Sequence, residues 1–172
     1  MPAPCVTTLA DSVINNCTRV GPGFASLKAT VAAWIDAFPA VDDTDTDTDG
    51  IPDNPQTITA DITLDTATYT GARWASMELS VDQNSFTSEQ NEDTGTFEST
   101  ITGVIRGVDP ATIYQLNKMS KQGMVFTYTD DSGQERVVGN PSNPAKLRFN
   151  DELGAASGDL VGQTITITWS HG

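Results

Sequence analysis

Alternating apolar and polar residues recur along most of the chain and predict short β-strands. In the segment 58–64, Ile, Ala and Leu alternate with Thr and Asp, so that one face of a strand is buried and the other is in solvent. Comparable segments, some of them shorter, occur at 77–81, 97–105, 124–128, 136–138, 146–149 and 165–169. The core of the protein is therefore predicted to be β.

One segment between these strands carries the signals of an α-helix. Asp109 suits the N-cap, Pro110 suits the first turn and Gly123 follows the expected end. The positive charges of two lysines near that end interact favourably with the helix dipole. The apolar stripe consists of Ile113, Leu116 and Met119. These residues predict a helix over 109–122.

A second helix is predicted near the N-terminal end of the folded region. Apolar residues recur there at spacings of three and four, Ser26 can cap the start and Pro39 ends the pattern. The stripe consists of Leu27, Val31, Trp34, Ile35 and Phe38. The spacing is typical of an amphipathic helix over 24–38.

These elements predict a mainly β protein, an antiparallel β-sandwich or barrel with one flanking α-helix and an additional N-terminal helix. A length of 172 residues suits one domain. We expect residues 1–23 to form an N-terminal arm and residues 24–172 to form a single β-barrel-like domain. The segment 41–56 has dense like charge and no periodicity, and is expected to be an acidic loop.

The charge of the chain restricts its partners. Twenty-three acidic residues against nine basic ones give a formal net charge of −14, which disfavours binding to nucleic acid or to an anionic membrane. No leader-like or membrane-spanning apolar stretch is present, so we expect a soluble, not conventionally secreted protein. Cys5 and Cys17 can close a small loop in an oxidising compartment or remain two free thiols.

The sequence lacks the motifs and spacings of common catalytic sites, although it contains many carboxylates and two cysteines. His171, the only histidine, is next to last, and neither a Gly-x-Ser-x-Gly motif nor a phosphate-binding glycine loop occurs. We therefore do not expect an enzyme. Three tryptophans lie within apolar patterns and are interpreted as core or interface residues rather than as a platform for ligands: Trp34, Trp74 and Trp169.

The acidic loop contains the spacing of a calcium-binding loop. Acidic residues at positions one, three and five, Gly50 at six and a backbone carbonyl at seven supply hard oxygens around a tight turn. Position twelve is Gln56 instead of the bidentate Glu. The candidate calcium ligands are Asp45, Asp47, Asp49, the Ile51 carbonyl and Asp53. The stretch resembles single thrombospondin type 3 and dockerin-like calcium loops, and an acidic solvated loop without metal is the alternative.

From about Ile58 onward, the chain resembles the tube-forming tail proteins of tailed bacteriophages and related contractile injection systems. The likeness consists of short alternating strands, one helix at 109–122 between two of them, Gly-rich hairpins and the loop 138–141 before the closing strands. The resemblance implies a barrel-like β-sandwich that assembles into rings, hexameric in that family, which stack into a tube in the virion tail after assembly in the host cytoplasm.

Two functions follow as hypotheses. In the first, the chain is a virion structural protein, the tail tube subunit, whose partners are its own copies and other tail proteins. DNA would pass through an acidic channel without being bound, because like charges repel. In the second, the chain is a calcium-stabilised surface-binding or decoration module of the virion.

Overall fold

A computed structural model describes residues 24–40, 60–80, 84–91, 94–106, 109–130, 135–152 and 162–171. Within these ranges most of the regular structure is β. The elements are β1 (Phe24–Val31), a 3₁₀-helix (Ala32–Trp34), β2 (Ile35–Ala37), β3 (Thr63–Leu64), β4 (Ala75–Met77), β5 (Ser85–Gln90), β6 (Phe97–Arg106), α1 (Pro110–Met119), β7 (Met124–Asp130), β8 (Glu135–Val138), β9 (Lys146–Glu152) and β10 (Gly162–His171).

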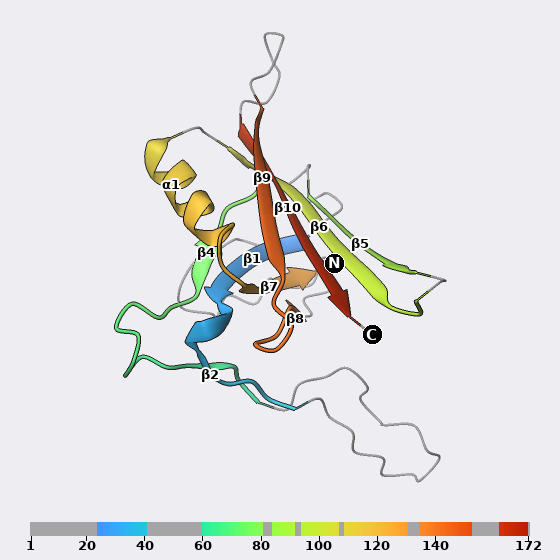
Figure 1. Ribbon diagram of the computed structural model, residues 1–172. Helices are drawn as coiled ribbons and strands as arrows, with labels where there is room; N and C mark the ends of the chain where they lie inside the picture. Colours follow the sequence, from blue (N-terminus) through green and yellow to red (C-terminus); the bar gives the residue numbers. More distant parts are fainter. Residues whose placement is uncertain are drawn as a thin grey trace, which may run out of the picture.

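Two four-stranded antiparallel sheets face each other (Figure 1). Sheet 1 has the strand order β4-β1-β7-β8, and sheet 2 has the order β5-β6-β10-β9. The longest ladder, between β6 and β10, runs from the pair Gly162 and Arg106 to the pair His171 and Phe97. A separate two-stranded ladder joins β2 to β3.

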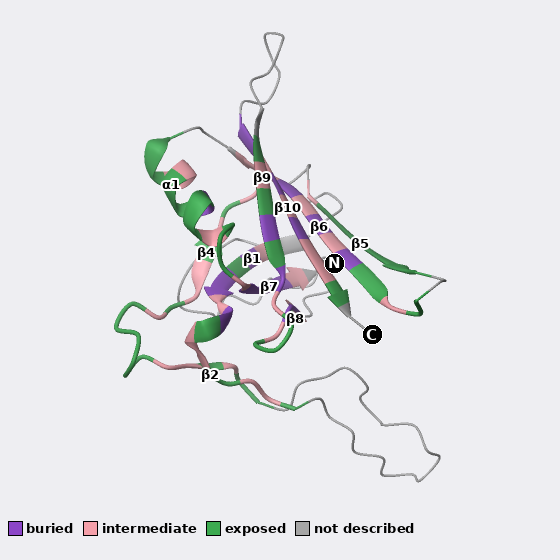
Figure 2. Ribbon diagram, in the orientation of Figure 1, coloured by how far each residue is buried: buried purple, intermediate pink, exposed green. Residues whose placement is uncertain are grey.

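The core lies between the inner faces of the two sheets. Sheet 1 contributes residues such as Leu27 and Phe126, and sheet 2 contributes Ile101 and Ile167. Figure 2 shows buried residues on the central strands of both sheets. The ring centroids of Phe86 on β5 and Tyr128 on β7 lie 5.2 Å apart, which connects an edge of sheet 2 to sheet 1.

Helix α1 connects β6 of sheet 2 to β7 of sheet 1 and flanks the sandwich (Figure 1). Its start is formed as the sequence predicts: the Asp109 carboxylate accepts hydrogen bonds from the backbone N–H groups of Ala111 and Thr112, at 2.9 and 3.0 Å. Leu116 is buried in the core. The prediction of a mainly β, antiparallel sandwich with one flanking helix is therefore confirmed.

The additional helix predicted over 24–38 is wrong. This segment forms β1, one 3₁₀ turn and β2. Leu27 and Val31 are four residues apart, and a spacing of four fits both a helix and an alternating strand. Ala29, which is 1% exposed, completes the alternation, and hydrogen bonding to β4 on one side and β7 on the other stabilises the extended conformation.

Other strands differ from their predicted bounds. Within the described part of the segment 58–64, only Thr63 and Leu64 are paired as a strand, and β4 ends at Met77. The sequence pattern gives no sign of β5, because all six of its residues are exposed and only Phe86 is a large apolar residue. The predicted N-terminal arm and the whole acidic loop 41–56 lie outside the described residues.

Candidate functional site

The outer face of sheet 1 is covered where its central strands meet. Thr30 on β1 and Val125 on β7 are register partners on this face, and they are 1% and 0% exposed. The Thr30 hydroxyl donates a hydrogen bond to the Arg73 carbonyl at 3.2 Å. The chain that leads from β3 to β4 therefore lies over the outer face of sheet 1.

Hydrogen bonds to residues 34–35 and within a local turn hold the covering segment, residues 60–74, in place. Ile35 on β2 pairs with Leu64 on β3, and the Asp65 N–H donates to the Trp34 carbonyl at 2.8 Å. The Asp65 carboxylate accepts a hydrogen bond from the Thr68 N–H at 2.8 Å. Hydrogen bonds from the Thr68 side chain and backbone lower the pKa of Asp65, so the turn favours the charged carboxylate.

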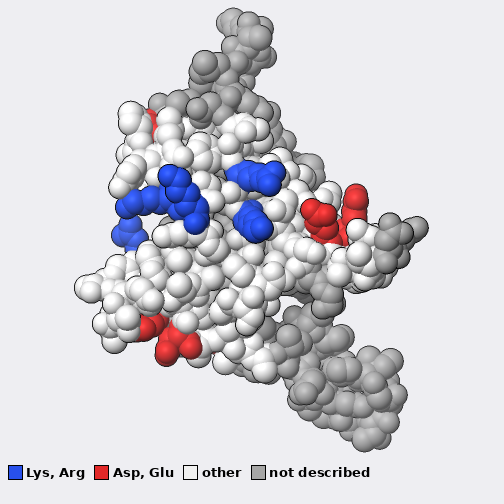
Figure 3. All heavy atoms as spheres, in the orientation of Figure 1, with Lys and Arg blue, Asp and Glu red and all other residues white. Residues whose placement is uncertain are grey.

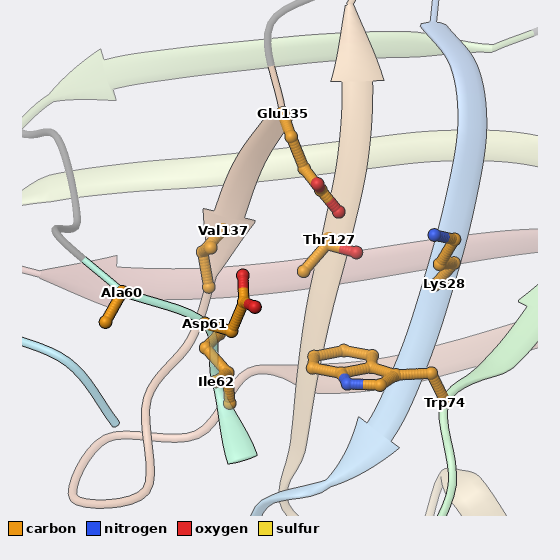
Figure 4. Close-up of a pocket in the computed structure, with 8 residues that line it drawn as sticks. All are labelled: Lys28, Ala60, Asp61, Ile62, Trp74, Thr127, Glu135 and Val137. Carbon is orange, nitrogen blue, oxygen red and sulfur yellow. The ribbon is translucent and has the colours of Figure 1, made fainter. Parts of the chain in front are cut away.

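Beside the covered area, the same face is hollowed into a pocket of about 560 Å³ (Figure 4). Its floor is a row of side chains across three adjacent strands, in which Lys28 pairs with Thr127 and Thr127 pairs with Val137. Trp74 and residues 60–62 form the sides. The lining residues are Lys28, Ala60, Asp61, Ile62, Trp74, Thr127, Glu135 and Val137.

The pocket contains charges of both signs next to an indole ring. Lys28, Asp61 and Glu135 are exposed, whereas Trp74 is half-buried and Thr127 is buried. Among the described residues, no ion pair engages these three charged groups. The Trp74 indole N–H likewise has no hydrogen-bond partner within that part of the chain. These polar groups are therefore accessible to a ligand or to solvent.

The outer face of sheet 2 has a different character, because among its residues of described burial only Gly162 is buried. Its centre consists of threonines that are register partners on adjacent strands, for example Thr168 on β10 and Thr100 on β6, or Thr166 and Thr102. The aliphatic residues between them, such as Ile167 and Ile101, point into the core. The result is a polar, mostly uncharged surface across four strands.

Charges lie at opposite sides of this surface. Lys146 and Arg148 on β9 are exposed at one edge, next to Thr168 and Thr166. Toward the other edge, Glu89 on β5 lies directly opposite Glu98 on β6. Like charges in this position destabilise a strand pair. Figure 3 shows basic side chains over β9 and toward α1, and acidic side chains on the β5–β6 side.

All five candidate calcium ligands lie outside the described part of the chain: Asp45, Asp47, Asp49, Ile51 and Asp53. The calcium site therefore stays a prediction. Cys5 and Cys17 also lie outside the described residues. In the described residues, no group of three or more His, Cys, Asp or Glu side chains is arranged to hold a metal ion.

Of the three tryptophans, Trp169 agrees with its interpretation as a core residue, since it packs against the core cluster. Its indole N–H also donates to the Asn143 carbonyl at 2.9 Å. Trp74 instead lines the pocket, which the sequence analysis did not anticipate. A lysine, two acids and a tryptophan from β1, the covering segment and β8 carry no common spacing that could have identified them.

No helix among the described residues is long and apolar enough to cross a membrane. Comparisons with protein-family models, with curated proteins and with solved structures found no match for this chain. The fold and its surfaces are therefore the basis for a functional proposal.

Proposed function

We propose that this protein is a structural subunit of a bacteriophage tail tube, whose copies join side by side into rings that stack around a DNA channel. One observation carries the proposal: sheet 2 has two edge strands, a polar face that none of the described segments covers, and opposite charges at its two sides. Surfaces that differ at two sides of a subunit favour head-to-tail association, which closes into a ring when the rotation between copies allows it.

The strand directions of sheet 2 are compatible with such a ring. All three neighbouring pairs in the order β5-β6-β10-β9 are antiparallel, so β5 and β9 run in opposite directions. When β9 of one copy pairs with β5 of the next, the antiparallel alternation continues without interruption. Edge strands with free N–H and C=O groups are the usual sites of such pairing.

The charges on the two edges support the same contact. Lys146 lies in a row with Thr168, Thr100 and Thr87, and Glu89 is two residues along β5 from Thr87. Two residues of a strand span roughly 7 Å. A shift of that size between copies, of the kind that closed barrels require, places Lys146 of one copy opposite Glu89 of the next.

In this arrangement the threonine-rich face of sheet 2 lines the channel. The contact between copies pairs Lys146 and Arg148, two exposed basic residues of this face, with acidic residues of the neighbouring copy. The net charge of −14 repels DNA from the channel wall. The tube thus acts as a conduit without binding its cargo.

Charge reversal tests the proposed contact. We expect the parent protein to form rings or tubes as its concentration rises, and the double variant Lys146→Glu/Arg148→Glu to remain monomeric, as measured by sedimentation velocity and electron microscopy. Glu89→Lys/Glu98→Lys should also be monomeric alone. Mixing the two variants restores opposite charges at every contact between unlike variants and should restore assembly in rings where the two alternate.

The control is Lys118→Glu/Lys121→Glu, which makes the same charge change at exposed residues of and just after α1. This variant should still assemble. A parent protein that stays monomeric, or forms only a small closed oligomer at all concentrations, contradicts the tube proposal and favours the decoration module. If the parent and both charge-reversed variants all form tubes, the result contradicts the β5–β9 contact but not the tube proposal.

A further inference from the structure

The pocket on sheet 1 lies on the opposite side of the sandwich from the face that the ring uses. Its row of Lys28, Thr127 and Val137 belongs to the outer face of sheet 1, whereas the ring proposal concerns the edges and outer face of sheet 2. In a ring lined by sheet 2, this pocket would face outward. Ligand binding in the pocket can be tested with monomeric protein, so it is independent of ring assembly.

The charges around the pocket restrict the ligand. Two carboxylates, Asp61 and Glu135, oppose an anion, and so does the net charge of the chain. A cation is opposed by Lys28 on the floor. A ligand without net charge meets neither repulsion, and it can still use both signs when it both donates and accepts hydrogen bonds.

Size and shape add a second restriction. A volume of about 560 Å³ lies within the usual range of small-molecule pockets, about 300–1,000 Å³. Trp74 supplies an aromatic surface and an indole N–H that has no hydrogen-bond partner among the described residues. The neutral compounds that combine a flat C–H surface with many hydroxyl groups are carbohydrates.

We propose that this pocket binds one or two sugar units of a neutral glycan. The sugar ring packs against the Trp74 indole, its hydroxyl groups donate hydrogen bonds to the Asp61 and Glu135 carboxylates, and its oxygens accept hydrogen bonds from the Lys28 ammonium. Charge-assisted hydrogen bonds of this kind are about twice as strong as neutral ones. Thr127, at the centre of the floor, limits the depth to which the ring can enter.

Fluorine NMR of protein labelled with 5-fluorotryptophan tests this proposal, because the chain contains three tryptophans and gives three signals. Trp74→Phe identifies the signal of Trp74. Methyl glucoside, methyl mannoside, methyl galactoside, N-acetylglucosamine, maltose and cellobiose are each titrated to about 50 mM, a range that detects millimolar dissociation constants. We expect at least one of them to shift the Trp74 signal in a saturable manner while the Trp34 signal stays unchanged.

Substitutions then connect the binding to the pocket. Trp74→Ala, monitored by calorimetry, should weaken the sugar at least about tenfold, and Asp61→Asn or Glu135→Gln should each weaken it about three- to tenfold. Two matched controls, Trp34→Phe and Glu89→Gln, change the same residue types outside the pocket and should leave the affinity unchanged.

Three outcomes would overturn the proposal. They are the absence of saturable binding by any of these sugars, an affinity that Trp74→Ala leaves unchanged, and a preference for glycine, glucosamine or galacturonate, which carry charge, over every neutral sugar. Because the titration uses monomers, for example of Lys146→Glu/Arg148→Glu, its failure leaves the ring proposal intact. Failure of the ring proposal likewise leaves sugar binding intact.

Discussion

Sheet 1 and sheet 2 have the same number of strands but differ in how their outer faces are used. In β7 of sheet 1, five consecutive residues, 124–128, are buried, so the strand is enclosed on both faces. In β10 of sheet 2, buried residues such as Ile165 and Ile167 alternate with partly exposed threonines, and the strand is enclosed on one face only (Figure 2).

One sandwich therefore presents two kinds of surface. A pocket remains between the covering segment 60–74 and sheet 1, beside Trp74. This pocket can enclose a small ligand. Sheet 2 has no such cover among the described residues, and its regular polar face ends in edge strands, which suit contacts between copies. A concave site and a flat assembly surface thus lie on opposite sides of one core.

Shortening one side chain on each outer face should change the free energy of unfolding by very different amounts. Val125→Ala removes buried methyl groups on the outer face of sheet 1 and should lower the free energy of unfolding by about 1–3 kcal/mol. Thr166→Ala, on the open face of β10, should change it by less than about 1 kcal/mol. Urea unfolding of both variants measures the difference. Equal losses would mean that the two outer faces are not differently covered in solution.

Replacing Gln163 on β10 should raise the free energy of unfolding, by a smaller amount than Val125→Ala lowers it. This residue is 0% exposed and shares the inner face with Ile165 and Ile167, and within the described part of the chain neither its amide oxygen nor its amide nitrogen has a hydrogen-bond partner. An unsatisfied buried polar group costs about 1–3 kcal/mol. Gln163→Met, which keeps an unbranched side chain, should therefore stabilise the protein by about 1–2 kcal/mol.

An increase in the midpoint of urea unfolding, with an unchanged dependence of the unfolding free energy on urea concentration, measures this stabilisation. Gln122→Met, at an exposed position after α1, is the matched control and should have almost no effect. A loss of stability in Gln163→Met would indicate that the amide has a partner in solution, such as a buried water. The inner face of sheet 2 would then contain a polar site, and the contrast with its outer face would be weaker.

Where local signals agree, the sequence predicts this fold well. Helix α1 follows from its cap at Asp109 and its apolar stripe, and β6, β7 and β10 follow from long alternation. Two elements could not be predicted because partners decide them. Strand β1 depends on hydrogen bonding to β4 and β7, and β5 is an exposed edge that depends on β6.

The candidate surfaces were less accessible to prediction than the fold. The pocket exists because strand register aligns Lys28 with Thr127 and Thr127 with Val137, and because residues 60–74 return over that row. The separation of Lys146 from Glu89 across sheet 2 depends in the same way on the order of strands. Sequence spacing records neither register nor strand order between distant segments, so these constellations appear only in the folded chain.

A smaller change is predicted in how stability depends on pH, through Asp109 at the start of α1, the helix that connects the two sheets. The Asp109 carboxylate accepts a hydrogen bond from the Thr112 hydroxyl, which is the main cause of its lowered pKa. Hydrogen bonds from the backbone lower this pKa further. The unfolded chain has a carboxyl pKa of about 3.9. The contribution of Asp109 to stability is therefore complete above that pH and is lost as the pH falls through the lower, folded pKa.

We expect Thr112→Val to raise the pKa of Asp109 toward its ordinary value, because the variant loses the largest single cause of the shift. Between pH 6 and pH 3, the melting temperature of this variant should fall less steeply than that of the parent, although it starts lower. Asp109→Asn, which retains an oxygen for the cap but not the charge, should show the same weaker dependence. Equal slopes in all three proteins would place the acid sensitivity in other carboxylates, such as Asp65 in the cover of sheet 1, where Asp65→Asn is the corresponding variant.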